Sequence, residues 1–155
     1  MPHAEVGALA ELRRQVRVPV MLDESLCGPL DAERAVAAGT CDLFNLRLSK
    51  CGGFIPSLRL AQLAKRHGLG YQLGCQVGET ALLSAAGRHF AASVTGLRYR
   101  EGSYDRHLVR EALGTRDVTF GWGGRAPALP GPGQGVAIDP AALGRVTVRK
   151  EAILG

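Results

Sequence analysis

Short apolar runs alternate along this chain with longer segments whose apolar residues recur at helical spacing. The apolar runs predict strands at 18–22, 42–48, 69–73 and 97–101. The longer segments predict helices over 6–16, 31–38, 56–67 and 79–92. Strands that alternate with helices are typical of parallel sheets with helices packed against them. We therefore expect an α/β protein with about four parallel strands and flanking helices.

Local signals mark the ends of several elements. Asp31 is a candidate N-cap for the second helix, and Gly39 is its expected stop. A fifth short run, 118–122, also predicts a strand, and the Gly/Pro-rich run from 126 to 135 predicts an irregular arm. Four strand-helix units and an arm are too few for a complete eight-stranded barrel.

Charged residues follow the first two apolar runs. Asp23 and Glu24 come directly after the first run, Arg47 lies near the end of the second, and Lys50 follows in the next turn. The carboxyl ends of parallel strands meet at one edge of a sheet, where α/β barrels keep their catalytic groups. We expect an acid to face two cations there, a geometry that suits a metal ion and an anionic substrate.

Two segments carry a resemblance to a known family. PVMLDES at 19–25 and NLRLSKCGG at 45–53 resemble the mandelate racemase and muconate-lactonizing branch of the enolase superfamily. The resemblance implies a (β/α)-type barrel in which three acids at strand ends bind Mg²⁺ and a base moves a proton α to a carboxylate. It places Asp23 at the third metal ligand and Arg47 where close relatives have a catalytic lysine. Glu24 would orient a ligand or a base.

The resemblance is incomplete. The family's other two metal-binding acids, its KxK base motif and its capping domain precede the matching region, and they have no counterpart in these residues. The resemblance therefore implies the C-terminal half of such a barrel at 1–125. It also implies an arm at 126–155 that would pack on a capping domain. We expect the isolated chain to be inactive and to bind Mg²⁺ weakly, because one carboxylate holds this ion poorly.

Arg47 and Lys50 are the candidate catalytic residues. An arginine stays protonated in proteins, so Arg47 would supply hydrogen bonds and charge to a substrate carboxylate or an enediolate, not act as a base. Lys50 has two interpretations: a structural lysine at the rim, or a replacement acid or base whose pKa Arg47 lowers.

Three further residues are candidates for substrate binding. Glu79 either caps its helix or lines the pocket, and Arg100 and Glu101 end the fourth strand. In the dipeptide epimerases of this family, two aspartates stand where this chain has Arg100 and Gly102. An amino-terminal dipeptide substrate is therefore not expected.

The resemblance implies an enzyme that forms an enediolate from a small carboxylate substrate, as a cycloisomerase, dehydratase or racemase. With an arginine in place of one base, one-base chemistry is favoured over two-base racemisation. The alternative is a catalytically inert fragment or pseudoenzyme that acts only through association with another chain.

The composition and the charge of the chain limit the classes of binding partner that we expect. The chain has 155 residues, is 46% hydrophobic and carries a net charge of +5, but its basic residues are spread out and only 5% of residues are aromatic. Nucleic-acid binding is therefore not expected. No apolar stretch reaches the roughly 20 residues of a membrane span, and the first residues lack a signal peptide's apolar core, so we expect a cytoplasmic protein without a membrane partner. The four cysteines form no CxxC pair, which argues against a zinc site or a disulfide framework.

A half-barrel also predicts association. We expect inward side chains, among them Met21, Leu46 and Tyr71 or Leu73, to face water, and two strand edges to lie open. Pairing with another copy or with a complementary barrel half would cover them.

Overall fold

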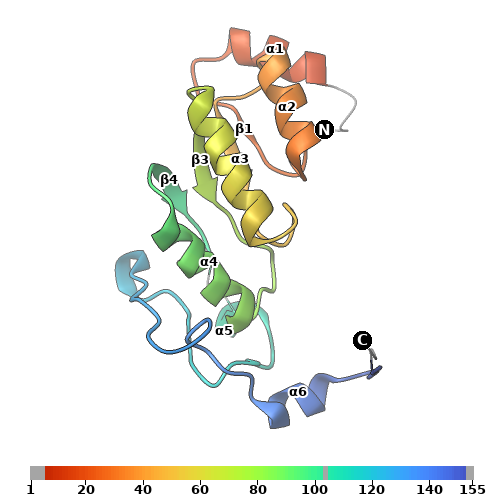
Figure 1. Cartoon of the computed structure of the whole chain (residues 1–155), viewed down its shortest axis with the longest axis vertical. Coiled ribbons are helices and arrows are strands. Elements are labelled where there is room, and N and C mark those ends of the chain that lie inside the picture. Colours follow the sequence, from red (N-terminus) through yellow and green to blue (C-terminus); the bar gives the residue numbers. More distant parts are fainter. Residues whose placement is uncertain (1–5, 103–104, 153–155) are drawn as a thin grey trace.

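A computed structural model describes residues 6–102 and 105–152 and shows one sheet with helices against it (Figure 1). The strands are β1 (Met21–Leu22), β2 (Leu43–Leu46), β3 (Gly70–Leu73) and β4 (Leu97–Arg100). They lie in the order β1-β2-β3-β4, and every neighbouring pair is parallel. This confirms the α/β fold class and its four parallel strands.

The helix α1 (Val6–Gln15) precedes β1, and the helices α2 (Pro29–Ala38), α3 (Phe54–Arg66) and α4 (Ala81–Ser93) connect successive strands. In Figure 1, α2, α3 and α4 follow one another along the same side of the sheet. The α2 helix begins earlier than expected, with Gly28 at its N-cap position. Asp31 lies in the first turn instead of capping it, and its carboxylate accepts a hydrogen bond from the Cys27 amide at 2.9 Å.

The hydrophobic core fills the space between the sheet and the helices. Phe44, Leu46 and Tyr71 are at most 1% exposed and belong to this core, and Leu73 joins them. The expectation that Leu46, Tyr71 and Leu73 face water was therefore wrong. Side chains alternate between the two faces of a strand, so it is their polar neighbours that occupy the opposite face.

A β-bulge changes the alternation in β4. Tyr71 pairs with Leu97 but Leu73 pairs with Arg100, so β4 has one extra residue between these positions. Because Leu73 faces the helices, Arg100 is carried to that side. Glu101, one residue later, returns to the opposite face.

The last third of the chain has little regular structure. It contains the short helices α5 (Asp105–Leu108), η1 (Trp122–Gly124) and α6 (Pro140–Val146). The strand predicted at 118–122 was wrong: Val118 is buried, but Trp122 is 97% exposed and begins η1. The run predicted to be irregular, 126–135, has no helix or strand, and α6 begins beyond it. Asp139 caps α6 by accepting a hydrogen bond from the Ala141 amide at 2.9 Å.

Two simple observations complete the description. All four cysteines are free thiols. Within residues 6–102 and 105–152, no helix has the length and apolar character needed to cross a membrane.

Candidate functional site at the carboxyl edge of the sheet

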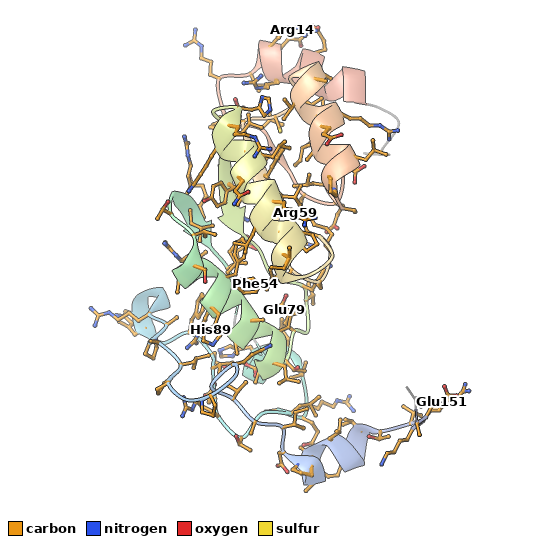
Figure 2. All side chains as sticks on the ribbon, viewed as in Figure 1. Arg14, Phe54, Arg59, Glu79, His89 and Glu151 are labelled. Carbon is orange, nitrogen blue, oxygen red and sulfur yellow. The ribbon has the colours of Figure 1, made fainter. Side chains whose placement is uncertain are left out.

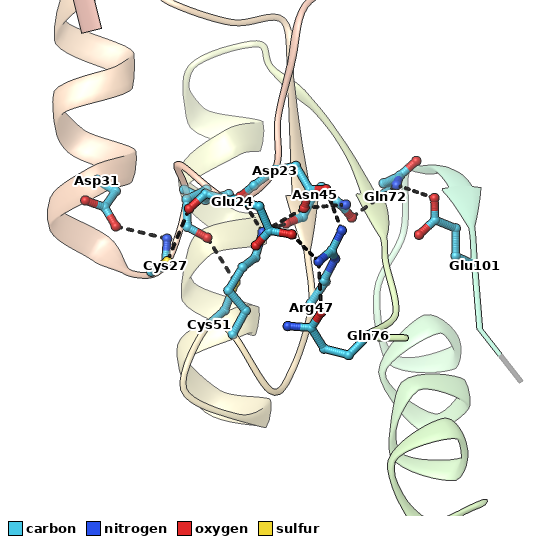
Figure 3. Close-up of polar contacts among 12 residues, drawn as sticks. Asp23, Glu24, Cys27, Asp31, Asn45, Arg47, Cys51, Gln72, Gln76 and Glu101 are labelled. Atoms are coloured by element: carbon cyan, nitrogen blue, oxygen red, sulfur yellow. Dashed lines mark hydrogen bonds and ion pairs between the residues drawn. The ribbon is translucent and has the colours of Figure 1, made fainter. Parts of the chain in front are cut away.

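The ends of β1 and β2 bring Asp23, Arg47 and Lys50 into direct contact. Figure 3 shows Asp23 and Arg47 pointing toward each other. The Asp23 carboxylate forms ion pairs with both cations: one oxygen with the Arg47 guanidinium and the other with Lys50 Nζ at 3.1 Å. The predicted arrangement of one acid facing two cations is therefore present.

Lys50 is held tightly in this site. Its side chain is 5% exposed, and Nζ donates to Asp23 Oδ1, to the Asp23 carbonyl oxygen and, at 3.2 Å, to the Asn45 carbonyl oxygen. An ammonium group has three donors, so these contacts use all of them. Lys50 ties the end of β1 to β2.

Arg47 joins the two acids to the loop after β3. Its Nη1 donates to Glu24 Oε1 at 2.6 Å and to Gln76 Oε1 at 2.9 Å, while Nη2 donates to Asp23. Burial lowers the pKa of Arg47, but the hydrogen bond to Glu24 and the charges of Asp23, Glu24 and Glu101 outweigh it and raise the pKa overall. The guanidinium therefore stays charged and offers no base. Glu24 helps to hold this guanidinium in place, and its expected role in orienting a metal ligand or a base stays a prediction.

A chain of hydrogen-bonded side chains crosses all four strands on the face that Figure 3 displays. We call Asp23, Asn45, Gln72 and Glu101 the polar ladder. Asn45 Nδ2 donates to Asp23 at 2.9 Å, and Gln72 Nε2 donates to Asn45 Oδ1 and to Glu101 Oε1, both at 3.1 Å. Asn45 and Gln72 are buried, so each amide is fixed by its neighbours.

Gly74 makes the ladder possible. A Cβ atom at this position would lie 2.1 Å from Asn45 Oδ1, far inside contact distance. Only glycine leaves room for the Asn45 amide over the end of β3.

The sequence-predicted substrate-binding residues occupy different places. Glu101 ends the ladder, whereas the β4 bulge places Arg100 on the helix side of the sheet. Glu79 does not cap α4, since Thr80 occupies the N-cap position. Its Oε1 accepts from the Gln76 amide at 2.7 Å and so supports the loop that contacts Arg47. Burial is the main cause that raises the pKa of Glu79.

Sequence reasoning missed Asn45, Gln72, Gln76 and Gly74. The signal for the first two was present: each is a polar residue within an apolar run, at the alternating position that shares a face with the strand-end acids. Gln76 carries no comparable signal, because its contact with Arg47 depends on how the loop after β3 folds.

The acids present do not by themselves form a metal centre. Within the described part of the chain, no three His, Cys, Asp or Glu residues are grouped so as to hold a metal ion. Asp23 is 40% exposed in its side chain, but both of its oxygens already contact cations. Asp23 fits the role of one ligand, and the remaining donors of an Mg²⁺ site are missing from this arrangement.

Comparisons with known proteins agree with this geometry. The family described as "Enolase C-terminal domain-like" matches residues 1–142. The chain is 33% identical over 138 residues to muconate cycloisomerase 1 of Rhodococcus opacus, covering 89% of this chain and 36% of that protein. It is 36% identical over 107 residues to the L-Lys-D/L-Arg epimerase of Methylococcus capsulatus, covering 67% and 30% respectively.

Solved structures extend the comparison. The dipeptide epimerase from Cytophaga hutchinsonii, complexed with Mg and the dipeptide D-Ala-L-Val, superposes with a TM-score of 0.84 at 26% identity. The match covers 94% of this chain and 39% of that one. The chain spans about a third of the length of the curated relatives above.

Proposed function

Because this chain belongs to the enolase superfamily, in its mandelate racemase and muconate-lactonizing family, we propose that its carboxyl-edge site is one side of an enediolate-forming active centre. The observation that carries the proposal is the contact of Asp23 with Arg47 and Lys50 at the ends of two adjacent parallel strands. The four strands form part of a (β/α) barrel, and a complementary barrel half would supply the other side.

Arg47 provides a fixed positive charge in this centre. It is 13% exposed and oriented by two acids and an amide, so little reorganisation is needed when negative charge develops nearby. It stabilises the enediolate or pairs with a carboxylate of a small substrate. Because it cannot accept a proton, the reaction uses one base, as in cycloisomerisation or syn-elimination.

Asp23 would contribute one ligand to Mg²⁺, and the complementary half would contribute the others. The bound ion would polarise the substrate carboxylate and thereby acidify its α-proton. In the chain alone Asp23 stays with its two cations. Glu101 and Arg100 face the two sides of the sheet at its far end, so Glu101 is the better placed of the two to meet substrate. Glu79 acts through Gln76.

Lys50 serves mainly as a fixed part of the rim. All three of its donors are engaged, which supports the structural interpretation over a replacement acid or base. A Lys50→Met variant that lost stability without changing the pH profile of turnover would agree with this role.

A second candidate function is association without catalysis. Its support is the self-contained network in which the cations of the chain itself satisfy both Asp23 oxygens. An inert chain of this kind would act by pairing with another polypeptide.

Deuterium exchange at the α-carbon of a substrate distinguishes the enediolate-forming function from association without catalysis. Small carboxylates with an α C–H bond would be incubated in D₂O and Mg²⁺ with the chain alone. A second sample would add the part of the Rhodococcus opacus muconate cycloisomerase that lies outside the matched segment. We expect no α-exchange by the chain alone and exchange by the assembled pair, lost on Asp23→Asn. Exchange by the chain alone that Asp23→Asn abolishes would overturn the proposal. An assembled pair without exchange would favour the inert alternative.

A further inference from the structure

A cavity next to the carboxyl-edge site lies between α4 and the C-terminal arm. Its volume is about 310 Å³, at the lower end of the range of small-molecule sites. We call it the arm cavity. Its apolar wall includes Leu73, Gly87, Ala91, Phe120, Pro127 and Ala128. Leu73 points to the helix side of the sheet, where most of the cavity lies, and Gly74, Glu79 and Glu101 line its end nearest the carboxyl edge.

The arm closes over α4 through contacts made by Arg88 and His89. Arg88 Nη1 donates to the Pro127 carbonyl oxygen at 3.0 Å, and Nη2 donates to the Val118 carbonyl oxygen. Figure 2 shows His89 on α4 beside the arm, and its Nε2 lies 3.0 Å from the Gln134 carbonyl oxygen. The Arg88 guanidinium also lies 5.7 Å from the centre of the Phe120 ring. The roof of the cavity is thus built by specific contacts.

Two buried polar atoms in the cavity wall have no partner. Ser84 is 4% exposed, and both its Oγ and Arg88 Nε lack a hydrogen-bond partner. These residues lie four apart on α4, one turn from each other on the same helix face. Buried polar groups almost always have partners, and a bound molecule is one explanation when they lack them. Both atoms can donate, so the missing group is an acceptor.

The charge of Arg88 indicates which acceptor fits. Burial lowers the pKa of Arg88, which reflects the cost of holding this charge away from water. The charges of Asp117 and Asp105 raise the pKa of Arg88, but by less than burial lowers it. The two acids that line the cavity have partners on the rim side: Glu79 accepts from the Gln76 amide, and Glu101 accepts from Gln72. An anion beside Arg88 would lower the cost of its burial.

We propose that the arm cavity binds a small apolar monocarboxylate, with its carboxylate at Ser84 and Arg88 and its hydrocarbon part against Leu73, Ala91 and Phe120. The site needs no metal ion, and the groups that would hold the ligand, Ser84, Arg88 and the apolar wall, take no part in the proposed enediolate chemistry.

Calorimetric titration with hexanoate tests this, using the full chain in the presence of EDTA, with hexanol as the neutral match. We expect hexanoate to bind and hexanol to bind at least about tenfold more weakly, since a charge-assisted hydrogen bond is lost. Equal binding of the two would overturn the carboxylate assignment, and no binding of hexanoate would overturn the site.

Two variants and one control locate the ligand. Ser84→Ala should weaken hexanoate binding about twofold to tenfold through the loss of one hydrogen bond. Ala91→Leu should abolish it by filling the apolar wall. Ala37→Leu adds the same side chain at an exposed position on α2 and should leave binding unchanged. Unchanged affinity in both cavity variants would contradict the proposal.

NMR on the unsubstituted chain locates the ligand without any substitution that could disturb the fold. Hexanoate should shift the Arg88 Nε–H resonance together with the amides of Ser84 and Phe120. Shifts centred on Asp23 and Asn45 would instead place the ligand at the carboxyl edge and refute the arm-cavity site.

Discussion

Arg47 is the residue whose chemistry most affects the proposed reaction. It stands at the position that the family resemblance assigns to a catalytic lysine, yet its contacts with Asp23, Glu24 and Gln76 hold it as a permanent cation. A lysine there could exchange a proton with substrate, whereas an arginine can only stabilise charge.

Two substitutions of Arg47 in the assembled pair separate charge from shape. Arg47→Met should reduce Mg²⁺-dependent turnover by about 10²-fold or more, because the charge facing the enediolate is lost. Arg47→Lys should retain part of the activity. Equal steady-state rates in all three proteins would show that Arg47 lies outside the active centre.

Gly74 offers a residue-scale test of the polar ladder. Gly74→Ala places a Cβ 2.1 Å from Asn45 Oδ1 and should displace the amide, at a cost of about 1–3 kcal/mol in the free energy of unfolding. Gly144→Ala is the control, because its Cβ would meet nothing within 4 Å. Urea unfolding measures both.

The polar ladder predicts that the effects of substitutions at Gly74 and Asn45 on stability are not additive. Adding Asn45→Ala to Gly74→Ala removes the clashing amide, so the double variant should lose less stability than the sum of the single ones. Additive losses would show that the amide does not occupy the space over Gly74.

At the scale of elements, the strands and helices were largely predictable because their apolar periods are local. The prediction of which face packs against the helices failed because it did not use the polar residues within the apolar runs. Leu46 and Tyr71 were expected on the face that points into the barrel, but they pack in the core between the sheet and the helices. Asn45 and Gln72 lie on the barrel-side face instead.

The part of the candidate site that lies at strand ends and in the recognised motifs was predictable. Asp23, Arg47 and Lys50 lie together as expected, because adjacent parallel strands end at one edge. Arg100 was misplaced relative to Glu101 because a β-bulge leaves no mark in the apolar pattern. The predicted strand at 118–122 failed because only Val118 of that run enters the core deeply.

An ion pair links α1 to Asp42, the residue before β2. Arg13 Nε donates to Asp42 Oδ1 at 2.9 Å, and Asp42 Oδ2 accepts from the Val20 amide at 2.8 Å. The hydrogen bond from Arg13 is the main cause that lowers the pKa of Asp42 below its ordinary value. A lowered pKa stabilises the fold above the unfolded pKa of about 3.9, and the contribution is lost as pH falls through the folded pKa.

The free energy of unfolding should therefore fall less in Asp42→Asn than in the unsubstituted chain when the pH is lowered from about 5 to about 3. Urea unfolding at the two pH values measures it, with Glu33→Gln, an exposed substitution on α2, as the control. An acid response in Asp42→Asn equal to that of the unsubstituted chain would contradict the assigned role of the pair.

At the scale of the molecule, the sheet is an open segment of a barrel. Neither β1 nor β4 has a second neighbouring strand among the described residues. Exposed apolar side chains lie at or near these edges: Val18, just before β1, is 69% exposed, and Tyr99 in β4 is 57% exposed. Parallel strands are normally covered on both faces, so a partner that closes the sheet is expected. The inner face carries charged and polar side chains, so a partner with polar groups fits it better than an apolar surface.

Sedimentation velocity over a concentration series, followed by urea unfolding at the same concentrations, tests this claim most directly. The account predicts self-association that grows with concentration and an unfolding midpoint that rises with it, because pairing closes the free edges of β1 and β4. A monodisperse monomer whose cooperative unfolding is independent of concentration would contradict the open-barrel account.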